Sequence, residues 1–411
     1  MNRTRWRTLA ALAVVTSIPT CQAAEPITLG KEPLTAGIAG EGSVDLPTIR
    51  TWLAEPKNHL PLQIELPEGL AAGKDAVWVP EDNPMTRAKI ELGRQLYFDR
   101  RLSKGNQVSC ADCHHPANAY GRGTQFGVGV EGQLGGRNSP VSFNRILSSI
   151  QFWDGRAASL EEQAKGPIAN PIEMGNTHEA VVQMLKVNPV YREQFVKVFQ
   201  REPNIDDVAR AIATFERALV TGPSPYDANE PLRRFEEAFA EQLEDMETFS
   251  EEQPEQVDRY RKLQIVAATR PMSESAKRGR ELFFSAKTNC TACHVGANFS
   301  DEKYHNLGVG MESDKPDLGR YVITKNEADK GAFKTPTLRN VAFSGPYMHD
   351  GSQKTLMEVV EWYAKGGHPS PYLSEKVKKL DLTQQDKEDL VAFMESLTGE
   401  LPAVEEGRLP E

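Results

Sequence analysis

Apolar residues recur at helical spacing late in each half of the chain. In residues 205–219 and again in residues 385–397, apolar side chains fall at positions i, i+3, i+4 and i+7. This periodicity predicts amphipathic helices whose apolar stripes face a core. Gly222 and Gly399 follow the two segments closely, and a glycine in this place commonly marks the end of a helix. The pattern therefore predicts one late helix in each half.

The two halves share a second, earlier pattern that predicts an internal repeat. Residues 84–98 and 271–284 each begin with Pro-Met and end with Gly-Arg-x-Leu-aromatic-Phe. Both segments are predicted to be capped helices, and each is followed after a short loop by a pentapeptide Cys-x-x-Cys-His. An early helix, this pentapeptide and a late helix, joined by loops, predict a small α-helical domain in each half.

The segments outside this repeat are predicted to be an arm and a linker. Residues 25–83 are Pro-rich and show no strong periodicity, which predicts an extended arm over the first domain. Residues 223–272 begin with a Pro-Ser-Pro turn. They carry Glu-rich amphipathic patterns at 232–249 and 255–267, which predict two helices. Their acidic face is interpreted as a solvated surface, with docking of a partner as the alternative. The predicted division is an arm at 25–83, domains at 84–222 and 273–411, and a linker at 223–272.

The beginning of the chain predicts export. Three arginines within the first seven residues form a basic region before an apolar stretch that starts at residues 9–15 and is too short to span a bilayer. Small residues around 21–24 then offer a cleavage site, so residues 1–24 are predicted to be a signal peptide and the mature protein to be periplasmic. A membrane anchor, or lipid attachment at Cys21, is the alternative. No later segment is long and apolar enough to span a membrane.

Length and charge narrow the range of partners. The chain has 411 residues, enough for two or three domains with cores of their own, and its composition is ordinary for a soluble globular protein. Its formal net charge is −10. This charge argues against binding of nucleic acid and favours attraction to a basic patch on a partner protein.

Both pentapeptides match the attachment signature of a c-type haem. In that chemistry the two thiols bond to the vinyl groups of one porphyrin, and the histidine binds the iron on its proximal side. Zinc sites or disulfide pairs are alternative interpretations, but neither requires a histidine directly after the second cysteine in both copies. The predicted attachment residues of two covalently bound haems are Cys110, Cys113, His114, Cys290, Cys293 and His294.

Several further motifs accompany the pentapeptides. They are Gly-Gly-Arg-Asn-Ser-Pro at 135–140, Phe-Trp-Asp-Gly-Arg-Ala at 152–157, the segment 163–174, Pro-Thr-Leu-Arg-Asn-Val at 336–341 and Gly-Pro-Tyr-Met-His-Asp-Gly at 345–351. Together, over roughly residues 84–400, the chain resembles the bacterial dihaem cytochrome c peroxidase family, which includes the MauG-like enzymes. The expected fold class is all-α, with two cytochrome c-like domains and long loops, each domain holding one haem. The resemblance implies that the first haem meets peroxide, the second stores and relays electrons, and a calcium ion lies between them.

The loop after the first pentapeptide bears on whether the first iron has a free coordination position. Family members that are inactive until reduced carry a blocking histidine there. Residues 126–134 contain no His, Met, Lys or Cys, and the resemblance matches Val130 to the blocking position. The first haem is therefore predicted to be five-coordinate at rest, with His114 as its protein ligand. His115 follows too closely to reach the other face and is interpreted as a solvent or propionate contact.

Cleavage of the O–O bond of peroxide needs a group that moves a proton from the near oxygen to the far one. A carboxylate over an apolar haem face can do so when burial raises its pKa. The resemblance implies this role for Glu173, with Gln163 as a neighbouring hydrogen-bond donor and Pro167 shaping the loop. An exposed loop acid is the alternative for Glu173. The resemblance also implies that Trp153 relays electrons between the haems, the alternative being a core tryptophan.

The calcium ligands expected from the resemblance are the side chain of Asn138 and the carbonyls of Ser344 and Pro346. Calcium prefers oxygen ligands, and backbone carbonyls are common among them. The sequence contains no visible acidic calcium-binding loop, so this expectation comes from the resemblance alone.

The distal ligand of the second iron separates two branches of the family. Residues 355–367 predict a capped helix in which Tyr363 lies on the apolar stripe. The matching residue is methionine in ordinary cytochrome c peroxidases and tyrosine in MauG-like members, so the resemblance implies Tyr363 as the ligand. A phenolate lowers the potential of the iron, whereas a methionine raises it. Met348 or Met357 as ligand, or no protein ligand, are the alternatives, with Tyr363 then a core residue.

Three functions stay open at this point. The first is a dihaem peroxidase that reduces hydrogen peroxide to water with electrons from a small periplasmic cytochrome c or copper protein. The second is MauG-like, peroxide-dependent oxidation of a residue on a protein partner, which Tyr363 and the missing blocking histidine favour. The third is a non-catalytic dihaem electron carrier with both irons six-coordinate. The complete set of peroxidase motifs favours the first function, and the resemblance adds a homodimer as an expectation.

Overall fold

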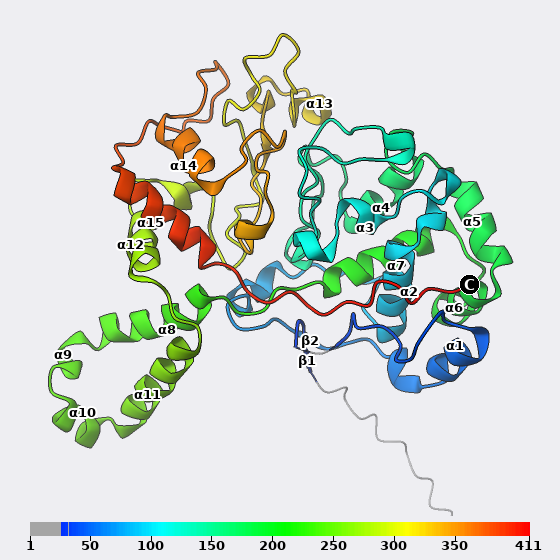
Figure 1. The fold of residues 1–411 in the computed structure, drawn as a ribbon. Coiled ribbons are helices and arrows are strands. Elements are labelled where there is room, and N and C mark those ends of the chain that lie inside the picture. Colours follow the sequence, from blue (N-terminus) through cyan, green and yellow to red (C-terminus); the bar gives the residue numbers. More distant parts are fainter. Residues whose placement is uncertain (1–25, 32) are drawn as a thin grey trace, which may run out of the picture.

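The computed structural model describes residues 26–31 and 33–411, so the predicted signal peptide at 1–24 lies outside the described residues. Figure 1 shows two groups of helices side by side and a helical hairpin that projects away from them. The strands in the described part of the chain have only two residues each, which confirms the predicted all-α class. None of the described helices is both long and apolar enough to cross a membrane.

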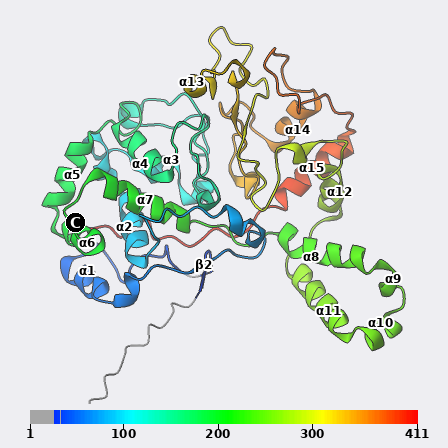
Figure 2. The ribbon, with the colours of Figure 1, turned by 180° about the vertical axis from the view of Figure 1, so that it is seen from behind.

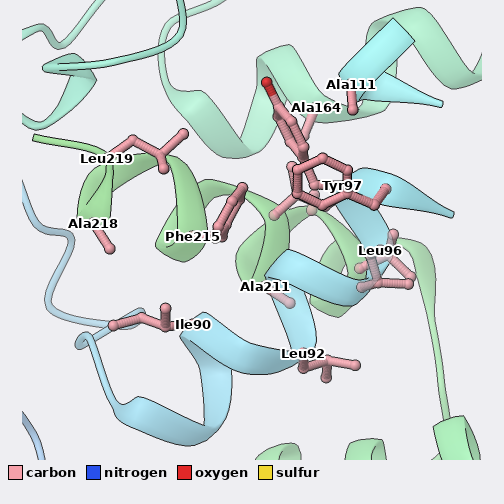
Figure 3. Packing of buried hydrophobic residues seen from close by; sticks show 14 of the residues in the cluster. Ile90, Leu92, Leu96, Tyr97, Ala111, Ala164, Ala211, Phe215, Ala218 and Leu219 are labelled. Carbon is pink, nitrogen blue, oxygen red and sulfur yellow. The ribbon is translucent and has the colours of Figure 1, made fainter. Parts of the chain in front are cut away.

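The first domain is formed by helices around one large apolar core. Its helices are α2 (Arg87–Phe98), α3 (Cys110–Cys113), α4 (Leu160–Ala169), α5 (His178–Val187), α6 (Pro189–Phe199) and α7 (Ile205–Ala218). α2 crosses α7 at Gly93, where a Cβ atom would lie 1.9 Å from the carbonyl oxygen of Ala211. This close approach lets Tyr97 pack on Phe215 with ring centroids 5.0 Å apart (Figure 3).

The second domain repeats this crossing with a smaller core. Its helices are α12 (Glu274–Phe283), α13 (Tyr321–Thr324), α14 (Leu356–Ala364) and α15 (Gln384–Glu395). α12 crosses α15 at Gly279, where a Cβ atom would lie 1.8 Å from the carbonyl oxygen of Asp389. The glycine of the repeated Gly-Arg-x-Leu pattern therefore has the same packing role in both halves, because only a residue without a side chain admits the second helix.

Replacement of Gly279 by alanine is expected to lower the free energy of unfolding of the second domain by about 3 kcal/mol, the upper end of the cost of overpacking, because the added methyl group meets backbone atoms. Denaturant unfolding followed by haem absorbance measures this change. Lys277→Ala on the exposed side of the same helix is the control and is expected to change stability by less than about 0.5 kcal/mol. Equal stabilities of the two variants would contradict the packing role.

The N-terminal arm lies on the first domain and includes a helix that periodicity did not predict. This helix is α1 (Leu46–Leu53), and the Asp45 carboxylate caps it by accepting the Thr48 N–H at 2.8 Å. The strands β1 (Ile27–Thr28) and β2 (Ile64–Glu65) pair in parallel within the arm. In the second domain, β3 (Tyr304–His305) pairs antiparallel with β4 (Phe333–Lys334).

The last residues of the chain return to the first domain. Residues 400–411, which we call the C-terminal strap, run along the first domain, as the red trace in Figure 1 shows. Three apolar residues of the strap pack against the core of the first domain. Fully buried Arg94 of α2 donates to the strap carbonyls of Glu405 at 2.6 Å and Arg408 at 2.8 Å. The packing thus differs from the expected division, in which the second domain extends to residue 411.

Residues 225–269 form the projecting hairpin, seen from both sides in Figures 1 and 2. Its helices are α8 (Pro225–Ala238), α9 (Ala240–Leu243), α10 (Met246–Glu252) and α11 (Pro254–Thr269). The single helix predicted over 232–249 is wrong, because the chain turns between α8 and α10. Asp245 caps α10, and the turn brings Phe239 within 5.5 Å of Phe249, measured between ring centroids. A small aromatic core of its own thus shapes the hairpin.

Candidate active site

A cavity of about 770 Å³ lies between the two domains and is lined by both Cys-x-x-Cys-His motifs. All four motif cysteines are free thiols, so the disulfide alternative does not describe this fold. The described residues contain one group of three potential metal ligands, and it includes Cys293 without Cys290, which gives the zinc alternative no support. Paired thiols, half-buried histidines and a large cavity suit two covalently attached haems.

The two motif histidines are oriented in the same way. Nδ1 of His114 lies 3.3 Å from the carbonyl oxygen of Tyr120, and Nδ1 of His294 lies 2.9 Å from that of Phe299. Since a carbonyl only accepts, Nδ1 carries the proton and Nε2 is left free to bind iron. Burial lowers the pKa of both imidazoles, which favours the neutral, iron-binding form.

Two hydrogen bonds hold the first motif in place. The Asp112 carboxylate accepts the Ser109 N–H at 2.8 Å and caps the short helix α3. Tyr97 of α2 donates its hydroxyl hydrogen to the carbonyl of His114 at 2.8 Å. His115 does not line the cavity, and its Nε2 lies 3.3 Å from a carboxylate of the C-terminal strap. His114 is therefore held by the helix that crosses α7, while its neighbour His115 points elsewhere.

Glu173 lines the cavity from the loop after α4 and is only partly exposed. Its carboxylate accepts a hydrogen bond from Nδ2 of Asn170 at 2.9 Å. Burial raises the pKa of this carboxyl, and the charge of Arg156 and the bond from Asn170 offset only part of that effect. A carboxyl in this environment takes up and releases a proton at a higher pH than an exposed glutamate does.

The loop at 126–134 packs against Glu173 and does not reach into the cavity. Val130 is buried, and its N–H donates to the carbonyl of Glu173 at 2.8 Å. Gly129 lies so close to the loop that carries Glu173 that a Cβ atom on Gly129 would be 1.9 Å from the carbonyl oxygen of Ile172. Among its described residues, this loop contributes only glycines to the cavity wall. It therefore presents no side chain that binds iron.

Gln163 and Pro167 lie one turn apart on α4, so they share the face that lines the cavity. Glu173 follows α4 after a few residues and lines the same cavity. The resemblance grouped these three residues, and in the structure all three line one cavity.

Trp153 lies at the junction of the two domains and lines the cavity. Its indole Nε1–H donates to the carbonyl of Asn138 in the first domain at 2.9 Å. Its own carbonyl accepts the N–H of Lys334, from β4 of the second domain, at 2.8 Å. Both domains therefore contribute to the position of this side chain.

Arg137 links the domains beside Trp153. Its guanidinium donates to the Asp317 carboxylate of the second domain at 2.6 and 2.9 Å and to the Asp154 carboxylate of the first domain at 2.7 Å. The Arg137 side chain is 21% exposed, so this ion-pair network is partly shielded from water. Arg137 belongs to the motif at residues 135–140, from which no role for it could be predicted.

Tyr363 of α14 lines the cavity near the second haem motif. Burial raises the pKa of its phenol, and the sulfur atoms of Cys293 and Cys290 add to this effect. Met348 lines the same cavity, whereas Met357 does not. Of the candidate distal ligands, Tyr363 and Met348 therefore have access to the cavity that both haem motifs line.

Two charged residues of the cavity wall, the buried Glu216 and the half-buried Arg145, were not recognised from the sequence. Glu216 of α7 and Arg145 both line the cavity. Burial raises the pKa of Glu216 to about 8, although the charge of Arg145 offsets part of the effect. The available signal was spacing, since Glu216 follows Ile212 by four residues and so shares its buried face. An acidic residue on an otherwise apolar helix face indicates that this face borders a polar or charged group as well as the apolar core.

The three residues expected to bind calcium line one cavity. Nδ2 of Asn138 donates to the carbonyls of Thr124 and Gln125 at 3.1 and 3.2 Å, so the amide turns its oxygen away from them. Among the described residues, no hydrogen bond reaches the carbonyls of Ser344 or Pro346. Neutral oxygens without donors fit a hard cation such as calcium.

Comparisons with known proteins assign most of the chain to two family models. The model described as di-haem cytochrome c peroxidase matches residues 87–233, and the model described as cytochrome c matches residues 276–398. Neither match covers residues 234–275, which include most of the projecting hairpin.

Named relatives extend over both domains. The methylamine utilization protein MauG of Methylorubrum extorquens is 35% identical over 333 residues, which cover 80% of this chain and 84% of that protein. Cytochrome c551 peroxidase of Nitrosomonas europaea is 34% identical over 336 residues, with coverage of 81% and 86%. A solved MauG-like protein associated with microbial copper homeostasis matches with a TM-score of 0.64 at 30% identity, covering 78% of this chain and 92% of that one.

Proposed function

We infer that the chain, which belongs to the di-haem cytochrome c peroxidase family, reduces hydrogen peroxide to water with electrons from a small cytochrome c or cupredoxin. The family resemblance, the two cytochrome c-type units and the two c-type haems expected from the sequence are confirmed by these relationships. One observation carries the proposal. A single cavity joins both haem motifs to the partly buried Glu173, beside a loop that offers no iron ligand.

The chemistry divides between the prosthetic group and the chain. A haem held by the first motif supplies an iron that binds peroxide and exchanges electrons with it. Glu173 takes the proton from the oxygen nearer the iron and returns it to the farther oxygen, which then leaves as water. Gln163 holds the peroxide by a hydrogen bond. Two electrons and two protons are consumed for each peroxide converted to two waters.

Two aromatic residues serve electron supply in this proposal. Trp153 relays electrons between the haems, supported by its bonds to both domains and its place on the wall of the cavity that both motifs line. Tyr363 is the distal ligand of the second haem, supported by its position on α14 beside Cys290 and Cys293. An anionic phenolate there lowers the potential of the second haem relative to a methionine ligand.

The remaining assignments concern calcium, location and assembly. We assign a calcium ion to the oxygens of Asn138, Ser344 and Pro346, because these residues line one cavity and the oxygens accept no hydrogen bond from the described residues. Export through residues 1–24 to the periplasm follows from the site of c-type haem attachment, which lies outside the bacterial cytoplasm. The electron donor docks by a basic patch, because the chain is acidic. A homodimer is the proposed assembly.

The resting ferric protein is expected to give two electron paramagnetic resonance signals, one high-spin and one low-spin. The high-spin signal arises because the first iron lacks a distal protein ligand, and addition of peroxide is expected to abolish it. Low-spin signals alone, unchanged by peroxide, would identify the non-catalytic electron carrier. Oxidation of a reduced cytochrome c during steady-state peroxide turnover then tests the peroxidase itself.

Oxidation of a residue on a protein partner is the second candidate function. The observation that favours it is Tyr363 on the cavity wall near the second motif, because a low-potential second haem retains an oxidising equivalent. Slow oxidation of every small donor protein, combined with a rapid peroxide-induced spectral change of the second haem, would favour this function over the first.

A further inference from the structure

A turn of the first domain enters a socket on the second domain. The turn is residues 152–155, in which Phe152 and Gly155 both have φ of +68°. The socket consists of the paired strands β3 and β4 together with Arg320. Tyr304 of β3 lies so close that a Cβ atom on Gly155 would be 2.0 Å from its hydroxyl oxygen. A glycine is needed there both for its backbone conformation and for this approach.

Arg320 holds this turn by two hydrogen bonds. One guanidinium nitrogen donates to the carbonyl of Asp154 at 3.0 Å and to that of Gly155 at 2.8 Å. The guanidinium carbon lies 4.5 Å from the centre of the Tyr304 ring, so stacking fixes its plane. The backbone N–H of Arg320 donates to the carbonyl of Ala332 at 2.8 Å, which ties the residue to the segment entering β4.

The bonds from Arg320 go to the two residues that follow Trp153 directly. The Trp153 carbonyl itself accepts the N–H of Lys334 in the same socket. Three successive carbonyls of the turn are thus bound by the second domain, while the indole of Trp153 is bound by the first. Arg320 does not line the cavity, so it reaches neither haem motif and acts only through the turn.

We propose that Arg320 is a positioning residue for electron transfer between the two haems, because it fixes the Trp153 turn of the first domain on the second domain. This inference rests on the proposed relay role of Trp153. Since both domains hold the indole, a loosened turn changes its position relative to both haems. A displacement of about 1 Å at a reacting group commonly costs about a hundredfold in rate.

Arg320→Gln is expected to slow inter-haem electron transfer about tenfold or more in the holoprotein. The measurement is rapid mixing of the fully reduced protein with peroxide, with oxidation of the second haem followed by its absorbance. Haem content, both midpoint potentials and the resting resonance signals are expected to stay unchanged. Amide hydrogen exchange at residues 152–155 is expected to accelerate, because the turn loses two bonds. Arg320→Lys, which keeps a donor, is expected to restore part of the rate.

The matched control is Arg278→Gln, which removes an arginine that pairs with Asp389 inside the second domain and is expected to leave the transfer rate unchanged. Gly155→Ala displaces the turn while keeping Arg320, and it is expected to slow transfer as well. If Arg320→Gln yields no holoprotein, the transfer rate of Gly155→Ala tests the proposal instead.

A double-mutant cycle with Trp153→Phe decides whether Arg320 acts through the tryptophan. Once Trp153 is replaced, Arg320→Gln is expected to cause no further slowing. An equal slowing in both backgrounds overturns the proposal and leaves the peroxidase function intact. If Trp153→Phe alone leaves transfer unchanged, the relay and the role of Arg320 both fall, although peroxide consumption at the first haem persists. Loss of peroxide reactivity in the wild-type holoprotein contradicts the proposed function itself.

Discussion

Substitution of Glu173 by glutamine is expected to lower peroxide turnover by about 10²–10⁴-fold, the usual contribution of a positioned acid–base group. Glutamine keeps the size of the side chain and its contact with Asn170, but it cannot accept a proton from peroxide. Both haems are expected to stay attached, since Glu173 belongs to neither Cys-x-x-Cys-His pentapeptide. Steady-state turnover together with the haem spectrum measures the effect.

The control for this substitution is Glu179→Gln, which makes the same change at an exposed position at the start of α5. It is expected to leave turnover unchanged. Unaltered turnover in Glu173→Gln removes this residue from the mechanism. The pH profile adds a second check. Burial raises the pKa of Glu173, and its proton-accepting form exists above that pKa. Wild-type activity is therefore expected to fall on acidification at a higher pH than an exposed glutamate allows, and the variant is expected to lose that limb.

Substitution of Tyr363 by methionine is expected to raise the midpoint potential of the second haem substantially. Axial ligands set haem potentials over a span of about 0.8 V, and a neutral thioether stabilises ferric iron less than an anionic phenolate does. The low-spin resonance signal and the absorbance bands of the second haem are expected to change with the potential. Spectroelectrochemical titration measures both haems in one experiment, and the potential of the first haem serves as an internal reference.

Met348→Leu is the companion variant, because Met348 lines the same cavity. If Tyr363 is the ligand, this substitution is expected to leave the potential of the second haem nearly unchanged. A large change in Met348→Leu, with no change in Tyr363→Met, would assign the iron to the methionine and favour an ordinary peroxidase.

Helical periodicity identified the elements whose determinants are local. The segments 205–219 and 385–397 became helices at Ile205–Ala218 and Gln384–Glu395, with ends displaced by at most two residues. Their stripes are buried by the partner helices that the repeat placed before them. Periodicity failed over 232–249, where an aspartate cap and a small aromatic core outweighed the pattern.

The candidate site depends more on contacts between distant segments. Glu173, Trp153 and Tyr363 were named through the family resemblance, because nothing local separates Glu173 from an exposed loop acid. Its partial burial comes from packing that the sequence does not reveal, such as that of the loop at 126–134. The bonds from Arg320 span 166 and 165 residues to their two carbonyls, beyond the reach of any local pattern.

The C-terminal strap orders events during biosynthesis. Arg94 binds a carbonyl that lies 314 residues further along the chain. Ribosomes make a polypeptide from its N-terminus, so the entire second half emerges before this guanidinium finds its acceptor. Contacts between residues this far apart in the sequence form late and slow folding. The half that is translated first therefore completes its packing only when residues 400–411 reach it.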